Sequence, residues 1–291
     1  MRNTQRTASS AAALLLAVGV AVSAQPVASA LPLGATPLRT QASVQVQNGP
    51  RLATPNADEP RPALSLSKLY LGHWVLHHGA PGDAARVEQM IRFSDDRIAS
   101  ELDARYPQAI DETADWFGLP NTHRNGFWGN SVTSANDLTR FLDATRNDPV
   151  AAPMFRGMET AAPVAADGYR QDYGTATVPG VTGTKFGWSD DRRSVHATAS
   201  IAPGVVLAAN TYGTREAHTA DVHAALPAGL PQLPGAPSGQ LSIDLGSSAI
   251  PAVSGAELKA RLACHDPYNL RAGIDDAWLI PVQIADAIPA C

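Results

Sequence analysis

The chain has 291 residues, 44% of them hydrophobic, so it is long enough to bury one large core. Its formal net charge is −5, and its one basic cluster is the pair Arg192-Arg193, so we expect no nucleic-acid partner. Only three lysines occur, Lys68, Lys185 and Lys259, against nineteen arginines (22 − 3 = 19). A buried lysine can lose its proton and act as a base, whereas arginine cannot. The positions of the lysines are therefore informative.

The N-terminal segment has the pattern of an export signal. Arg2 and Arg6 precede an apolar run at 11–22, and small residues follow it. The run is too short to span a bilayer, and the order is typical of a secretory signal peptide. We predict a signal peptide at 1–30, no integral membrane span after its removal, and a secreted or cell-envelope location. An uncleaved anchor is the alternative.

The remaining elements change from helical to strand periodicity along the chain. Residues 31–62 are predicted to be a proline-rich leader with a first edge strand at 43–47. Apolar residues at helical spacing predict helices at 63–78, 82–104, 108–118 and 134–147. A period of two then predicts a three-stranded antiparallel meander within 181–210, followed by a helix at 215–226. This order predicts an α/β (α+β) fold, an antiparallel sheet with a helical cluster.

The C-terminal part is predicted to be a separate appendage at 241–291, reached through a proline-rich linker at 227–240. The appendage contains both cysteines, Cys264 and Cys291. Because an exported protein meets an oxidising compartment, we predict that they form a structural disulfide. Two unpaired thiols are the alternative.

Ser65 and Lys68 have the spacing of a nucleophile and its base. Three positions apart near a helix start, they lie on one helix face. A serine hydroxyl is a poor nucleophile until a base such as neutral lysine removes its proton. Neutrality near pH 7 requires the lysine pKa to fall by about three, through burial or through a second cation such as Lys185. The alternative is a first-turn serine with a solvated cation.

Three segments occur in an informative order: Ser65-Leu66-Ser67-Lys68, the run 90–99 with Ser94-Asp95-Asp96 at its centre, and Lys185-Phe186-Gly187-Trp188. They resemble the three motifs of the serine β-lactamase and penicillin-binding protein (DD-peptidase) superfamily. The resemblance covers roughly 43–226 and implies a β-lactamase/transpeptidase-like domain at 63–226. The chain resembles a divergent, secreted and trimmed member of this superfamily.

The resemblance implies a role for each catalytic candidate. Ser65 would be the acylated nucleophile and Lys68 its base. Ser94 would relay a proton to the leaving group, and Lys185 would hold the substrate carboxylate and keep that relay polarised.

The resemblance also implies a set of substrate-binding residues. The N–H groups of Ser65 and Trp188 would form the oxyanion hole. Gly187 would let the substrate backbone approach the strand edge, and Arg192 or Arg193, on the next strand, would add charge for a carboxylate. The alternative for both arginines is a solvated turn. Asp96 stands where the family usually has an asparagine that donates to the substrate.

Other departures also matter for the activity. Phe186 stands where the family has a hydroxyl residue, and Ser65 and Ser94 are only 29 positions apart, so the helical domain must be trimmed. No glutamate lies between Trp116 and Asn130, where a β-lactamase would have its water-activating group. The resemblance therefore implies a DD-peptidase-like serine hydrolase rather than a β-lactamase.

We accordingly predict an exported serine hydrolase that acts through an acyl-serine on cell-wall peptide or related amide or ester substrates. Its partner would be a cell-wall peptide or a β-lactam-like small molecule. The alternative is a catalytically inactive member that binds a cell-wall peptide or a protein in the same cleft. The histidines form no zinc-protease pattern, so we predict no metal site and no cofactor.

Overall fold

The computed structural model describes residues 31–226, 230, 252–254 and 279–281. The predicted signal peptide, most of the linker and both cysteines lie outside the described residues. The chain divides into two compact units, Met1–Ala236 and Pro237–Cys291. In the second unit, β10 (Ala252–Ser254) pairs antiparallel with β11 (Leu279–Pro281). Among the described residues, no helix is long and apolar enough to cross a membrane.

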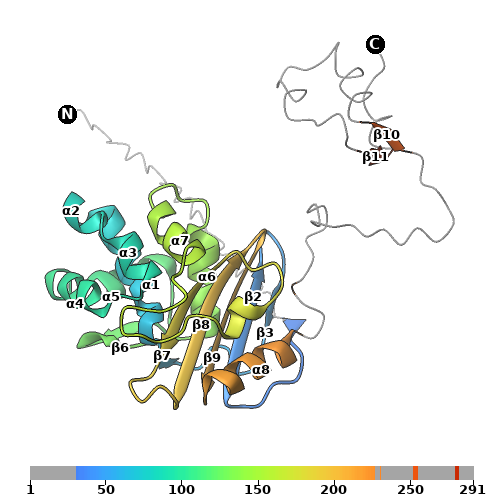
Figure 1. Cartoon of the computed structure of the whole chain (residues 1–291), viewed down its shortest axis with the longest axis horizontal. Coiled ribbons are helices and arrows are strands. Elements are labelled where there is room, and N and C mark those ends of the chain that lie inside the picture. The colour runs from blue at the N-terminus through green and yellow to red at the C-terminus, as the bar shows by residue number, and fades with distance from the viewer. Residues whose placement is uncertain (1–30, 227–229, 231–251, 255–278, 282–291) are drawn as a thin grey trace, which may run out of the picture. The chain divides into compact units, whose positions relative to one another are not determined.

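The first unit is built on one six-stranded sheet (Figure 1). Its strands are, in spatial order, β1 (Leu31–Pro32), β3 (Arg51–Ala53), β2 (Thr40–Val46), β9 (Val205–Tyr212), β8 (Val195–Ala202) and β7 (Gly183–Trp188). Strands β7, β8 and β9 form the predicted antiparallel meander.

Strand β2 is an interior strand, so its predicted position at the sheet edge is wrong. It pairs with β9 along its whole length and with β3 on its other side. Two polar residues of this strand, Gln41 and Ser43, are buried and hydrogen-bonded. The Ser43 hydroxyl bonds the Thr139 hydroxyl at 2.9 Å, and the Gln41 side chain donates to the Glu59 carbonyl at 3.0 Å.

Helices cover both faces of the sheet (Figure 1). One face packs against a cluster that includes a 3-10 turn, η1 (Leu64–Leu66), with α1 (Ser67–His78), α5 (Ala109–Phe117), α6 (Ala135–Thr145) and α7 (Ala152–Glu159). The other face packs against α8 (Arg215–Ala225) and a 3-10 turn, η2 (Gly174–Thr177). All but α7 and η2 correspond to predicted helices.

The predicted helix at 82–104 is wrong as a continuous element. It is three helices, α2 (Pro81–Ala84), α3 (Val87–Arg92) and α4 (Asp96–Arg105). The break between α3 and α4 occurs because Ser94 has a φ of 51°. Asp95 then caps α4 by accepting a 3.0 Å hydrogen bond from the Ile98 N–H. A left-handed non-glycine residue is uncommon and concentrates at functional sites. The turn lifts Ser94 out of the helices.

A second, small antiparallel sheet lies beside the start of α1. It consists of β4 (Arg61–Pro62), β6 (Phe127–Thr133) and β5 (His123–Asn125) in the order β4-β6-β5. The Ala63 N–H extends its pairing by donating to the Ser131 carbonyl at 2.8 Å. This sheet carries Trp128 toward the turn at 64–66.

Candidate active site

Ser65 lies on the 3-10 turn that leads into α1, and strand β7 packs directly against that turn. Leu64 has a φ of 54°, which bends the chain there. A Cβ added to Gly187 would lie 2.9 Å from the Leu64 Cβ and 3.2 Å from the Ser65 nitrogen. Gly187 thus packs against the backbone of the turn that carries Ser65, and its expected role in substrate approach stays a prediction. Glycine is needed here because no side chain fits.

The Lys68 amine connects the other polar groups of the site. Its Nζ lies 2.7 Å from the Ser65 Oγ, 3.3 Å from the Ser94 Oγ and 3.1 Å from the Ser94 carbonyl. The same Nζ lies 2.5 Å from a carboxylate oxygen of Asp96 and 4.2 Å from the Trp128 ring centre. The predicted pairing of Ser65 with Lys68 is thus present as a hydrogen bond.

The protonation of Lys68 reflects two opposing effects. Burial lowers the pKa of Lys68 to about 8, and the Asp96 carboxylate acts against that fall. Of the two causes that the sequence left open, burial and repulsion from Lys185, burial is the main one. Trp128 also favours the charged form, because a ring face attracts a cation. At neutral pH the amine is mainly protonated.

Lys185 lies behind Ser94 and is fully buried. Its Nζ donates to the Ser94 Oγ at 2.8 Å and to the Phe186 carbonyl at 2.8 Å. Burial, followed by the charge of Lys68, holds the pKa of Lys185 well below its usual value. The Ser94 hydroxyl therefore lies between two amines, as a proton relay would require.

Lys185 is not among the residues that line the cleft beside Ser65. Its expected contact with a substrate carboxylate stays a prediction. Phe186 lacks the hydroxyl that the family has at this position. Its ring is instead buried against Tyr173, with ring centres 5.2 Å apart.

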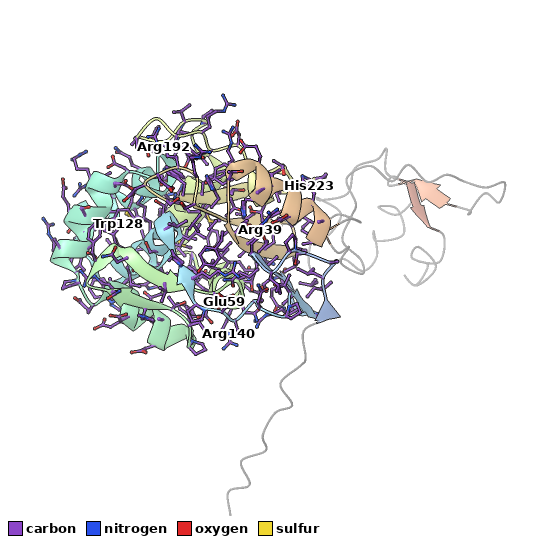
Figure 2. The ribbon with its side chains drawn as sticks, turned by 90° about the horizontal axis from the view of Figure 1, so that it is seen from below. Arg39, Glu59, Trp128, Arg140, Arg192 and His223 are labelled. Carbon is purple, nitrogen blue, oxygen red and sulfur yellow. The ribbon has the colours of Figure 1, made fainter. Side chains whose placement is uncertain are left out.

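The cleft beside Ser65 has a volume of about 320 Å³. The residues that line it are Leu64, Ser65, Asp96, Trp128, Gly129, Asp167, Trp188, Ser189, Asp190 and Arg192. They include four predicted residues, Ser65, Asp96, Trp188 and Arg192. Arg192 comes from the turn between β7 and β8 rather than from the next strand, and Trp128 comes from β6 (Figure 2).

The charge of the cleft is opposite to the one expected. Asp96, Asp167 and Asp190 line it with a single arginine, Arg192. That arginine already donates to the Asp167 carbonyl at 2.9 Å. The lining is therefore acidic and offers little to a substrate carboxylate.

Sequence reasoning missed Trp128 and Asp167. The Asp167 carboxylate accepts a 3.1 Å hydrogen bond from the Trp188 indole, and Tyr169 stacks on that indole with ring centres 4.8 Å apart. These contacts fix the tryptophan at the end of β7. Asp167 lies between elements, where neither periodicity nor a motif indicates a site.

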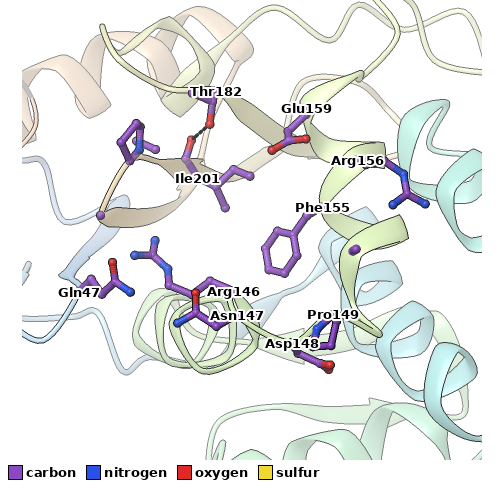
Figure 3. A pocket seen from close by; sticks show the side chains of 14 residues that line it. Gln47, Arg146, Asn147, Asp148, Pro149, Phe155, Arg156, Glu159, Thr182 and Ile201 are labelled. Atoms are coloured by element: carbon purple, nitrogen blue, oxygen red, sulfur yellow. Dashed lines mark hydrogen bonds between the residues drawn. The ribbon is translucent and has the colours of Figure 1, made fainter. Parts of the chain in front are cut away.

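No glutamate lines the cleft in the described part of the chain. The Glu112 carboxylate accepts a 2.7 Å hydrogen bond from the Trp74 indole on α1. Glu159 lines a separate cavity of about 540 Å³ between α7 and the β8–β9 turn (Figure 3). The water-activating glutamate of a common β-lactamase thus has no counterpart in this cleft.

Comparison with known proteins bears on the fold. No protein-family model and no curated protein matches the sequence. Among solved structures, the chain is similar to the β-lactamase from Sphaerobacter thermophilus DSM 20745, with a TM-score of 0.51 and 16% identity over 65% of this chain and 90% of that one. The β-lactamase from Streptosporangium roseum has a TM-score of 0.52 and 14% identity over 65% of this chain and 92% of that one. The β-lactamase from Streptomyces albus G has a TM-score of 0.51 and 17% identity over 64% of this chain and 91% of that one.

These matches confirm the predicted fold, an antiparallel sheet with a helical cluster, which the chain shares with the three β-lactamases. They confirm the predicted resemblance at the level of the fold. A fold hosts many functions, so the activity must be argued from the site.

Proposed function

We propose that the chain is an exported serine hydrolase that forms an acyl-enzyme at Ser65. The observation that carries the proposal is the continuous chain of hydrogen bonds from the Ser65 Oγ through the Lys68 Nζ and the Ser94 Oγ to the Lys185 Nζ. Both amines are buried, and Ser65 lines the cleft beside them. Burying two amines costs free energy, and buried titratable groups with perturbed pKa values concentrate at functional sites.

The arrangement supports a two-step acyl transfer. Neutral Lys68 accepts the Ser65 proton while the serine oxygen bonds to the substrate carbonyl carbon. The N–H groups of Ser65 and Trp188 stabilise the oxyanion. The bond to the leaving group then breaks, and the proton passes from Lys68 through Ser94 to that group. Water finally releases the acyl group and restores the Ser65 hydroxyl.

The acidic lining narrows the substrate class. Asp96 and Asp190 disfavour a free carboxylate next to the scissile bond, because like charges repel in a partly enclosed cleft. We therefore favour an ester, or an amide without an adjacent carboxylate, in a cell-wall peptide or a related molecule. The missing glutamate supports a peptidase-like or esterase-like reaction over β-lactam hydrolysis.

The test is hydrolysis of a neutral ester, p-nitrophenyl butyrate, by the full-length protein at pH 8.5. The decisive variant is Ser65→Ala, and its matched control is Ser67→Ala. Ser67 is also buried, two positions away, but its hydroxyl donates to the Leu64 carbonyl at 2.8 Å instead of facing Lys68.

We expect turnover by the wild type and by Ser67→Ala, and none above background by Ser65→Ala. Equal turnover by Ser65→Ala would place the reaction elsewhere. A wild type that neither turns over nor becomes acylated would favour the alternative, a protein that only binds a peptide or a partner in this cleft.

A further inference from the structure

Two histidines of α1 and an aspartate from another element converge far from the cleft. His73 and His77 are four residues apart on α1, which places them on one face. Asp148 lies on the connection between α6 and α7. Its Oδ2 is 2.7 Å from the His77 Nε2 and 3.6 Å from the His73 Nε2. One ligand atom from each residue lies within 4.8 Å of the other two.

The Asp148 carboxylate is held in place for both histidines. Its other oxygen accepts a 2.9 Å hydrogen bond from the Val150 N–H, and its own N–H donates to the Thr145 carbonyl at 2.9 Å. Asp148 lies at the margin of the cavity of about 540 Å³, beside Pro149 (Figure 3). The side chains of His77 and Asp148 are 21% and 23% exposed, so an ion can reach them from solvent.

An ion pair with Asp148 accounts for the position of His77, but it does not account for the burial of His73. The His73 side chain is only 2% exposed, and its Nδ1 has no hydrogen-bond partner in the described part of the chain. Its Nε2 is too far from Asp148 for a hydrogen bond. A buried imidazole nitrogen without a hydrogen-bond partner is costly.

We propose that His73, His77 and Asp148 bind one divalent transition-metal ion of the zinc class. Two imidazole nitrogens and one carboxylate oxygen form a ligand set that zinc accepts, with water as a fourth ligand. The ion would bind the His73 Nε2, which lies 3.6 Å from the Asp148 carboxylate. It would also join α1 to the α6–α7 connection, near the end of the helix opposite Ser65. This role is structural and independent of the proposed hydrolysis.

The test is titration of the metal-free, full-length protein with Co²⁺, followed by visible absorption and by competition with Zn²⁺. The variants are His77→Ala and Asp148→Asn. His123→Ala is the control, because His123 is exposed on β5 and lies outside the cluster. All variants keep both cysteines, so any binding by thiols is common to them and cancels in the comparison.

We expect one Co²⁺ per chain in the wild type and in His123→Ala, displaced by Zn²⁺. Affinity should fall at least about tenfold in His77→Ala and in Asp148→Asn, since even groups that only orient ligands contribute 10–100-fold. Zn²⁺ should raise the melting temperature of the wild type by a few degrees and leave that of Asp148→Asn unchanged. Equal affinity in all four proteins, or no specific Co²⁺ spectrum in the wild type, would overturn the proposal.

Discussion

The carboxylate of Asp96 lies 2.5 Å from the Lys68 amine, on the same amine that hydrogen-bonds the Ser65 hydroxyl. A carboxylate beside a base favours its protonated form. Burial acts in the opposite direction and is the larger effect. Because Asp96 is 61% exposed, water screens part of its charge. The pair sets how much neutral Lys68 is available to activate the serine.

Asp96→Asn should raise the activity at neutral pH. Removing the carboxylate charge lowers the pKa of Lys68, and below that pKa each further unit of decrease raises the neutral fraction about tenfold. We expect kcat/KM for p-nitrophenyl butyrate at pH 7 to rise several-fold. Acylation by a penicillin, which carries a carboxylate, should rise as well.

Asp190→Asn separates the effect of Asp96 on the pKa of Lys68 from its effect on the charge of the cleft. It removes the same charge from the cleft lining, but Asp190 makes no hydrogen bond or ion pair with Lys68. We expect it to raise penicillin acylation more than ester hydrolysis. If Asp96→Asn hydrolysed the ester no faster than the wild type at any pH, Asp96 would not control the base.

The pH profile of the wild type should report the titration of Lys68. Only neutral Lys68 accepts the serine proton, so the rate should increase as pH rises from 6 and level off above about 8, where the pKa of Lys68 lies. The same profile measured on Asp96→Asn should reach its plateau at lower pH. A rate that falls with rising pH, or identical profiles for the two proteins, would contradict this assignment.

Ser94→Ala should disable proton transfer without unfolding the chain. Its hydroxyl accepts from Lys185 at 2.8 Å and lies 3.3 Å from the Lys68 amine, so its loss breaks the only direct link recorded between the two amines in the described structure. A positioned proton-transfer group contributes about 10²–10⁴ in rate. We expect kcat for the ester to fall at least about 100-fold while the circular dichroism spectrum is unchanged. A change of less than about threefold would remove Ser94 from the mechanism.

Gly187→Ala should damage the site through packing. The added methyl would lie 2.9 Å from the Leu64 Cβ and 3.2 Å from the Ser65 nitrogen, which forces the nucleophile turn away from β7. Overpacking of this kind costs about 1–3 kcal/mol. The control is Gly82→Ala on α2, where no atom lies within 4 Å of the added Cβ. Chemical denaturation should show the loss for Gly187→Ala only, together with reduced ester hydrolysis.

Local patterns were sufficient to predict that Ser65 and Lys68 lie together. Ser65 and Lys68 meet because they are three residues apart at the start of one helix, a relationship that the sequence contains. Lys185 was placed on the first strand of a meander because period-two alternation and turn residues mark that region.

The features that depend on distant contacts were not predictable in the same way. The position of β2 inside the sheet depends on pairing with β9, which lies more than 150 residues later. The break at Ser94 was hidden by apolar residues that continue at helical spacing, although Asp95 supplied a capping signal. Asp148 joins His73 and His77 only because α6 and α1 pack in one core.

The central claim is that Ser65 becomes acylated through Lys68. Intact-protein mass spectrometry after rapid mixing with p-nitrophenyl butyrate at pH 8.5, followed by acid quenching and peptide mapping, tests it most directly. We predict one butyryl group per chain on Ser65 in the wild type and in Ser67→Ala, and none in Ser65→Ala or Lys68→Ala. A wild type without an adduct under conditions of turnover, or an adduct on another residue that persists in Ser65→Ala, would contradict the account.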